Sequence, residues 1–118
     1  QLSLKDFGEA SLRSDKTIPM NAQCTVFAES EVVSLIHSST PKEDIAKAVL
    51  DAVASRVTAM ARRVGIEGEV ALIGGMVHNV GFVQSLKTAL GVDQVLLPEM
   101  PEYVSALGAA LMAADGNA

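Results

Sequence analysis

The chain has 118 residues, of which 49% are hydrophobic and 19% are charged, and its formal net charge is −5. A chain of this length forms one modest domain, and this composition supplies a packed core and differs from that of disordered chains. The acidic balance argues against a nucleic-acid partner, the apolar runs are too short to cross a bilayer, and no signal segment opens the sequence. We therefore expect a soluble, cytoplasmic protein that binds neither nucleic acid nor membrane. Because the sequence begins at Gln1 rather than at a methionine, we expect it to be part of a longer protein.

The first segment, residues 1–23, is predicted to be a short helix followed by a connector. Ser3, with Asp6 three residues later, predicts a capped helix that extends to about Leu12. Residues 13–22 are polar and contain a proline, so we expect them to be extended.

The second segment, residues 24–65, is predicted to be helical. Apolar residues recur at helical spacing from Cys24 to about His37, with glutamates near the start, where negative charge suits the helix dipole. The sequence Thr40-Pro41-Lys42-Glu43 predicts a capping box with proline at the first helical position. A long apolar stripe follows until Gly65, which provides a C-terminal stop. This pattern predicts a long helix that packs into the core.

The third segment, residues 66–118, is predicted to alternate between strands and helices. Residues 70–73 and 94–97 are short continuous apolar runs, as expected of strands buried on both faces. Helical patterns follow each of them, over residues 81–90 and 102–114. The order strand, helix, strand, helix predicts an α/β fold with parallel strands and crossover helices.

A glycine pair lies where the first predicted strand gives way to a helix, in the sequence Gly74-Gly75-Met76-Val77-His78-Asn79. Open parallel sheets bind ligands at this place, and glycines there let a nucleotide lie against bare backbone. An ordinary turn that needs a positive φ explains the pair equally well. The Asn79 amide could contact a base, ribose or phosphate, but capping the next helix is the commoner role of asparagine there. Gly108, in the last predicted helix, would permit close approach by a backbone or a ligand.

Cys24 is the single cysteine, so the chain has no internal disulfide. The N-terminus of its helix favours the thiolate form, which suits a metal ligand, whereas spacing alone favours a small buried hydrophobe, because Cys24 shares a face with Ala28 and Val32. One thiol cannot hold a cluster; a two-fold axis would double it, and further ligands would lie outside this chain. His37 and His78 lack companion ligands at zinc spacing and are interpreted as surface or capping residues.

Four blocks of the sequence together resemble a known family. These blocks are Cys24 to Val32 (CTVFAESEV), Ala54 to Val57 (ASRV), Ile73 to Asn79 (IGGMVHN) and Tyr103 to Leu111 (YVSALGAAL). They resemble, in the same order, blocks of the BadF/BadG/BcrA/BcrD-type ATPases, which include 2-hydroxyacyl-CoA dehydratase activators and ATPase subunits of benzoyl-CoA reductase. The resemblance covers essentially the whole chain. It implies the fold of the acetate kinase, sugar kinase, Hsp70 and actin superfamily, in which two related lobes enclose ATP, and this chain resembles most of the second lobe.

The resemblance also implies cofactors and partners for the full-length protein. Gly74, Gly75, Met76 and Asn79 match the family's adenosine-side glycine motif, so ATP or ADP with Mg²⁺ is the implied nucleotide. Cys24 matches one ligand of a 4Fe-4S cluster shared across a homodimer or a pair of homologous ATPase subunits. The implied partners are an acyl-CoA dehydratase or reductase component and a low-potential electron donor such as ferredoxin. The family's phosphate-binding loop and its other cysteine lie upstream of the matched blocks, so no catalytic residue is assigned here and this chain alone is expected to be inactive.

Two other classes of protein are consistent with parts of the sequence. A sugar-kinase-like or acetate-kinase-like phosphotransferase would use the same fold, and Cys24 would then fill the core without a cluster. A non-catalytic interaction domain could also retain the fold, and it would not bind nucleotide.

Overall fold

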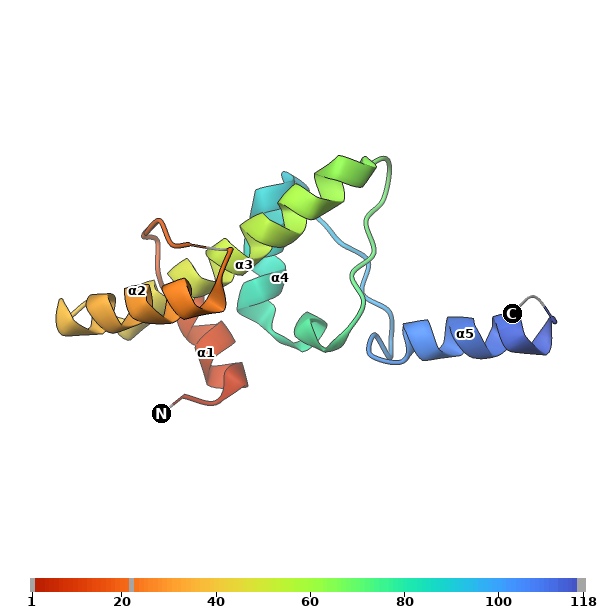
Figure 1. Ribbon diagram of the computed structural model, residues 1–118, viewed down its shortest axis with the longest axis horizontal. Helices are drawn as coiled ribbons and strands as arrows, with labels where there is room; N and C mark the ends of the chain where they lie inside the picture. Colours follow the sequence, from red (N-terminus) through yellow and green to blue (C-terminus); the bar gives the residue numbers. More distant parts are fainter. Residues whose placement is uncertain (1, 22, 117–118) are drawn as a thin grey trace.

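The computed structural model describes residues 2–21 and 23–116, and most of that chain is helical (Figure 1). The helices are α1 (Leu4–Ser11), α2 (Thr25–His37), α3 (Lys42–Val64), the 3₁₀ helix η1 (Gly75–His78), α4 (Val80–Leu90) and α5 (Val104–Ala114). The order and approximate bounds of the α-helices agree with those expected from the sequence, whereas η1 lies where a glycine turn was expected. The connector has no helix among its described residues, and Ala22, which belongs to it, lies outside the described part.

The predicted cap of α1 is confirmed. The Ser3 hydroxyl accepts a hydrogen bond from the Asp6 amide at 3.1 Å, and the Asp6 carboxylate accepts from the Ser3 amide at 3.3 Å and from the Ser3 hydroxyl at 2.7 Å. These reciprocal bonds satisfy amide groups that the first turn of a helix otherwise leaves unpaired.

The predicted capping box of α3 is wrong, although the helix itself is as long as expected. Pro41 is the N-cap rather than the first helical residue, because its ψ of 140° is extended, and no side chain caps this end. Thr40 therefore lies outside the helix, one residue too early to cap it. Charged side chains stabilise the helix dipole instead, because Glu43 and Asp44 lie in the first turn of α3 and two arginines lie in its last turn.

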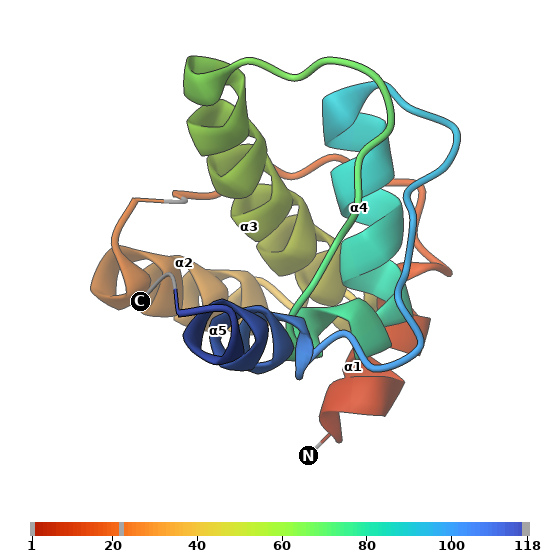
Figure 2. The ribbon, with the colours of Figure 1, turned by 90° about the vertical axis from the view of Figure 1, so that its right-hand side faces the viewer.

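The core forms where α1 and α4 pack against α3, and α2 contacts α3 as well. In the end-on view of Figure 2, α3 and α4 lie side by side. Leu50, Ala54, Phe82 and Leu86 form the buried centre of this contact. Burying a side chain as large as phenylalanine or leucine contributes about 1.5–3 kcal/mol, so this cluster is a principal source of stability.

A second close contact joins α1 to α4 through two glycines. A Cβ atom on Gly81 would lie 2.1 Å from the Ser11 hydroxyl oxygen and 2.6 Å from the Gly8 carbonyl oxygen. A Cβ atom on Gly8 would lie 2.6 Å from the Asn79 side-chain oxygen. The two helices approach this closely because neither glycine has a side chain.

The two predicted strands shorten to a single parallel bridge between Ala71 and Leu96. The Leu72 amide donates to the Leu96 carbonyl at 2.9 Å, and the Leu96 amide donates to the Val70 carbonyl at 2.8 Å. The parallel direction agrees with the expectation, but neither extended strands nor a sheet buried on both faces forms in the described residues. Ile73 and Leu96 are 44% and 51% exposed, because no further strand covers either side of this pair within the described chain.

The last helix, α5, extends away from the other helices, and the described chain measures 57 × 29 × 26 Å (Figure 1). None of its residues is buried. A Cβ atom at Gly108 would meet no other atom within 4 Å, so the close approach expected at this glycine does not occur within the described chain. Among the described residues, no helix combines the length and apolar character that a membrane crossing requires.

Candidate functional site

The predicted glycine site is a turn of bare backbone that follows the apolar run 70–73, which contains the bridge residue Ala71. Gly74 has a φ of 95°, and its amide donates to the Pro101 carbonyl at 2.9 Å. Gly75 then begins η1 and does not have a positive φ. A Cβ atom on either glycine would meet no other atom within 4 Å, and the next residue, Met76, is 45% exposed. The turn therefore presents its main chain to the surroundings, as a nucleotide contact requires.

Asn79 has a structural role at the end of this turn. Its side-chain oxygen accepts from the Phe82 amide at 2.9 Å, which caps α4, and its Nδ2 donates to the Leu4 carbonyl at 3.3 Å. The residue is 8% exposed. The capping role weighed from the sequence is confirmed, and Asn79 also joins the turn to α1, which no local pattern indicates.

Two contacts connect the glycine turn to the residues just before α5. One is the hydrogen bond from the Gly74 amide to the Pro101 carbonyl, and in the other His78 Nε2 lies 3.2 Å from a Glu102 carboxylate oxygen. The backbone amide of Glu102 itself and then His78 donate to this carboxylate, and together they hold the pKa of Glu102 below its ordinary value. Both histidines, His37 and His78, are exposed, as the sequence predicted.

Cys24 is the N-cap residue of α2, and its side chain makes no capping hydrogen bond. The thiol is free and half-buried, as are Ala28 and Val32 on the same face, so the fully buried position that spacing favours is not observed. An uncommitted sulfur at a helix N-terminus fits a single metal–sulfur bond. No group of three or more metal-ligating side chains occurs among the described residues, so any further ligands of a cluster would come from outside them.

The structure does not bring Cys24 and the glycine turn into one site. The helix that begins after Cys24 packs against α3, whereas η1 packs against α4. The contact between α3 and α4 therefore lies between the two candidate positions.

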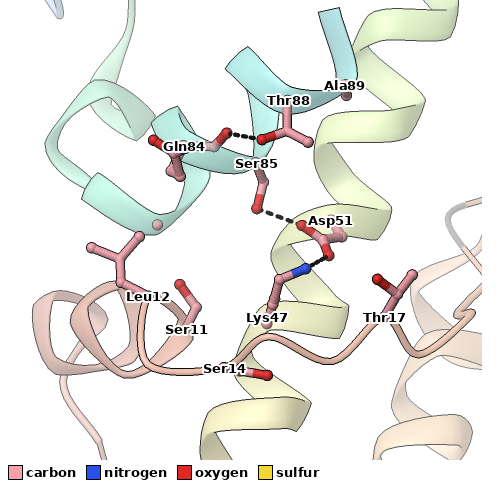
Figure 3. Close-up of a pocket in the computed structure, with 11 residues that line it drawn as sticks. Ser11, Leu12, Ser14, Thr17, Lys47, Asp51, Gln84, Ser85, Thr88 and Ala89 are labelled. Atoms are coloured by element: carbon pink, nitrogen blue, oxygen red, sulfur yellow. Dashed lines mark hydrogen bonds and ion pairs between the residues drawn. The ribbon is translucent and has the colours of Figure 1, made fainter. Parts of the chain in front are cut away.

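A pocket of about 430 Å³, lined mainly by polar residues, lies between α1, α3, α4 and the connector, and the sequence did not indicate it (Figure 3). Lys47 and Asp51 form an ion pair along α3, and the Ser85 hydroxyl donates to Asp51 at 2.7 Å. The pair at positions i and i+4 could be read from the sequence, but its serine partner lies 34 residues away. Because these polar groups satisfy one another, the network explains how α3 and α4 are held together.

Solved structures that share the architecture of this chain include two proteins of dehydratase systems. One is an activator of 2-hydroxyisocaproyl-CoA dehydratase from Clostridium difficile with bound ADPNP, with a TM-score of 0.85, 33% identity, and coverage of 98% of this chain and 43% of that one. The other is component A of (R)-2-hydroxyglutaryl-CoA dehydratase from Acidaminococcus fermentans, with a TM-score of 0.87, 39% identity and coverage of 98% and 44%. The fold is thus that of part of an activator ATPase.

The sequence comparison leads to the same class of protein. The model of the BadF/BadG/BcrA/BcrD ATPase family matches residues 1–113, and this chain belongs to that family. The (R)-2-hydroxyglutaryl-CoA dehydratase activating ATPase of A. fermentans is 41% identical over 96% of this chain. A benzoyl-CoA reductase subunit from Thauera aromatica is a more distant relative, 25% identical over 92% of the chain. The chain spans about 43% of the length of the activators it matches.

Proposed function

We propose that this chain is the second lobe of an ATP-dependent activator that delivers low-potential electrons to an acyl-CoA dehydratase or reductase component. The observation that carries the proposal is the match to activator ATPases along almost the whole chain, in sequence and in structure. The electron donor would be a ferredoxin-like protein, and the setting would be the cytoplasm.

The glycine turn is the proposed contact for ATP or ADP with Mg²⁺. Gly74, Gly75 and Met76 would face the adenosine side of the nucleotide, and support comes from the open space above both glycines. Asn79 would act mainly by holding the turn, because its amide already caps α4 and binds the Leu4 carbonyl. The related activator with bound ADPNP supports a nucleotide site in this class of protein.

Cys24 is the proposed ligand of a 4Fe-4S cluster shared with a second protomer, either an identical chain or a homologous ATPase chain. Such a cluster supplies one-electron transfer when it is bound. Support comes from the free, half-buried thiol at the start of α2. Val26 and Phe27, in the first turn behind it, are 66% and 59% exposed, which suits a helix that meets a partner protein there.

The proposal is tested by replacing the thiol in the full-length protein. We expect Cys24→Ser, purified without oxygen, to lose the iron and the visible absorbance of the cluster, while ATP affinity and the melting temperature stay close to wild type. Thr25→Ser, which keeps the cysteine, is the matched control and should retain both iron and colour. The measurements are iron and acid-labile sulfide content, the visible spectrum and calorimetric nucleotide titration on the same samples.

The test also separates the alternatives. A Cys24→Ser protein with wild-type iron content would contradict the cluster assignment. If wild type binds ATP but no iron, a phosphotransferase of the same fold becomes the better assignment.

A further inference from the structure

The peptide bond that precedes Cys24 is held on its amide side by the connector. The Asn21 side-chain oxygen accepts from the Gln23 amide at 2.8 Å and from the Cys24 amide at 3.4 Å. Asn21 is itself held in place, because its backbone amide donates to the Glu31 carboxylate on α2 at 2.7 Å. The segment before α2 is therefore folded back against the helix that it precedes.

The same peptide is held on its carbonyl side by a different element. Arg56, on α3, donates from Nη1 to the Gln23 carbonyl oxygen at 3.1 Å, across 33 residues of sequence. The Gln23 carbonyl and the Cys24 amide belong to one planar peptide unit. Bonds at both of its ends fix the orientation of that plane, which includes the Cys24 Cα atom that carries the thiol side chain.

Arg56 lies between two contacts that join α3 to α4. Asp51, five residues before it, accepts from Ser85, and Arg62, six residues after it, donates to the Ala89 carbonyl at 2.9 Å. The part of α3 that carries Arg56 is thus attached to α4, whose N-cap, Asn79, ends the glycine turn. Arg56 therefore links the peptide that precedes Cys24 to α3.

We propose that Arg56 is a positioning residue for Cys24: its guanidinium orients the Gln23–Cys24 peptide so that the thiol projects in the direction a shared cluster requires. The inference rests on the proposed function, in which Cys24 is a metal ligand. A charged donor suits this task, because a charge-assisted hydrogen bond is stronger than a neutral one. A long side chain is also needed, because the Gln23 carbonyl lies in a different segment from α3, and the guanidinium must reach it from the helix.

The experiment compares Arg56→Met, which keeps the length of the stem but removes the donors, with Arg56→Lys, which keeps a charged donor. Arg63→Met is the matched control, because Arg63 lies on the last turn of the same helix and has no hydrogen bond or ion pair to any described residue. The full-length variants are examined by hydrogen exchange, iron content, nucleotide titration and thermal melting.

For Arg56→Met we expect exchange of the amides of residues 23–28 to accelerate about tenfold. Exchange within α3 and α4, ATP affinity and the melting temperature should stay at wild-type values, and iron content should fall at least about twofold. Arg56→Lys should recover part of both changes, and Arg63→Met should match wild type.

Three outcomes would overturn the inference. Unchanged exchange at residues 23–28 in Arg56→Met would show that the peptide is held without the guanidinium. Faster exchange throughout α3, with a lower melting temperature, would show a general structural role. Wild-type iron in Arg56→Met, when Cys24→Ser has lost its iron, would contradict positioning while the proposed function stands. If Cys24→Ser instead keeps its iron, the proposed function fails, and the exchange data still decide whether Arg56 orients the peptide.

Discussion

The two neighbouring glycines of the turn are glycines for different reasons. Gly74 has a φ of 95°, a conformation that residues with a side chain adopt only with strain. Gly75 has no positive φ, and a Cβ atom there would meet no atom of the described residues within 4 Å. The fold of the described residues therefore explains Gly74 but not Gly75. The absence of a side chain at position 75 is instead what a ligand lying against the turn would require.

This difference predicts that a substitution at position 75 lowers ATP affinity, whereas a substitution at position 74 lowers the stability of the fold. In the full-length protein, Gly75→Val should lower ATP affinity at least about tenfold and leave the melting temperature nearly unchanged, because its side chain occupies only the space proposed for the nucleoside. Gly74→Ala should instead destabilise the fold by about 1–2 kcal/mol through backbone strain. Calorimetric titration and urea unfolding measure the two effects. Unchanged ATP affinity in Gly75→Val would indicate that the glycine pair forms an ordinary turn with no role in nucleotide binding.

The capping box of α1 predicts a dependence of stability on pH. The hydroxyl and amide of Ser3 donate to the Asp6 carboxylate and lower its pKa below the ordinary value of 3.8. A lowered pKa in the folded state means that the stabilisation is fully present above the unfolded pKa and is lost as pH falls through the folded pKa. Asp6→Asn should therefore be less stable than wild type at pH 6, and the difference should shrink as the pH falls below 4.

Urea unfolding between pH 3 and pH 6 measures this difference. Asp15→Asn is the control, because Asp15 is exposed and has no hydrogen bond or ion pair to any described residue. It should not change the slope of stability with pH. An Asp6→Asn protein whose deficit stays constant over this range would contradict the capping role of the ionised carboxylate.

Residues that contact positions close to them in the sequence were predictable, and residues that contact distant positions were not. The Ser3 cap and the Asn79 cap follow from their distance to the next helix, and both are observed. The Thr40 cap failed because Pro41 adopts an extended ψ and moves the helix start by one residue. The bond from Arg56 to the Gln23 carbonyl has no local signal, because its two ends are 33 residues apart.

At the scale of elements, helices were predictable because each carries its own hydrogen bonds, whereas strands need neighbours. The apolar runs 70–73 and 94–97 do pair in parallel, but only through the bridge between Ala71 and Leu96. A pair of strands without a third is marginal, and its outer faces stay open to solvent. A sheet buried on both faces, as expected from the sequence, would therefore require further strands, and none is present in the described residues.

The contact between α1 and α4 predicts a large effect for a small substitution. Gly81→Ala should destabilise the fold by about 1–3 kcal/mol, because its Cβ atom would overlap the Ser11 hydroxyl oxygen and the Gly8 carbonyl oxygen. Gly108→Ala is the matched control within a helix, and it should stabilise α5 by about 0.5–1 kcal/mol, because its Cβ atom would meet no other described atom within 4 Å. Urea unfolding of both variants of this chain measures the difference. Equal stability of the two would contradict the close approach of α1 and α4.

At the scale of the molecule, apolar side chains are exposed along two helices that contribute little to the core. Val26, Phe27 and Ile36 on α2, and Leu107 and Leu111 on α5, are each more than half exposed. Isolated apolar residues are normal on a protein surface, but groups of them on one helix mark surfaces that meet another part of a protein or a partner. The chain spans about 43% of the length of related activators. We therefore expect these two helices to contact the rest of a full-length protein or a partner protein.

The same consideration predicts that the 118-residue chain by itself does not hydrolyse ATP at a measurable rate. Hydrolysis requires the phosphates and a metal ion to be held in place, whereas the glycine turn offers only backbone beside the proposed nucleoside. Phosphate release should therefore match the protein-free background, while the full-length protein, assayed at equal concentration, should turn over. Gly75→Val of the full-length protein is a second control, because it should weaken binding without changing the fold. Turnover by the short chain at a rate comparable to that of the full-length protein would contradict the assignment of this chain to one lobe of a two-lobed site.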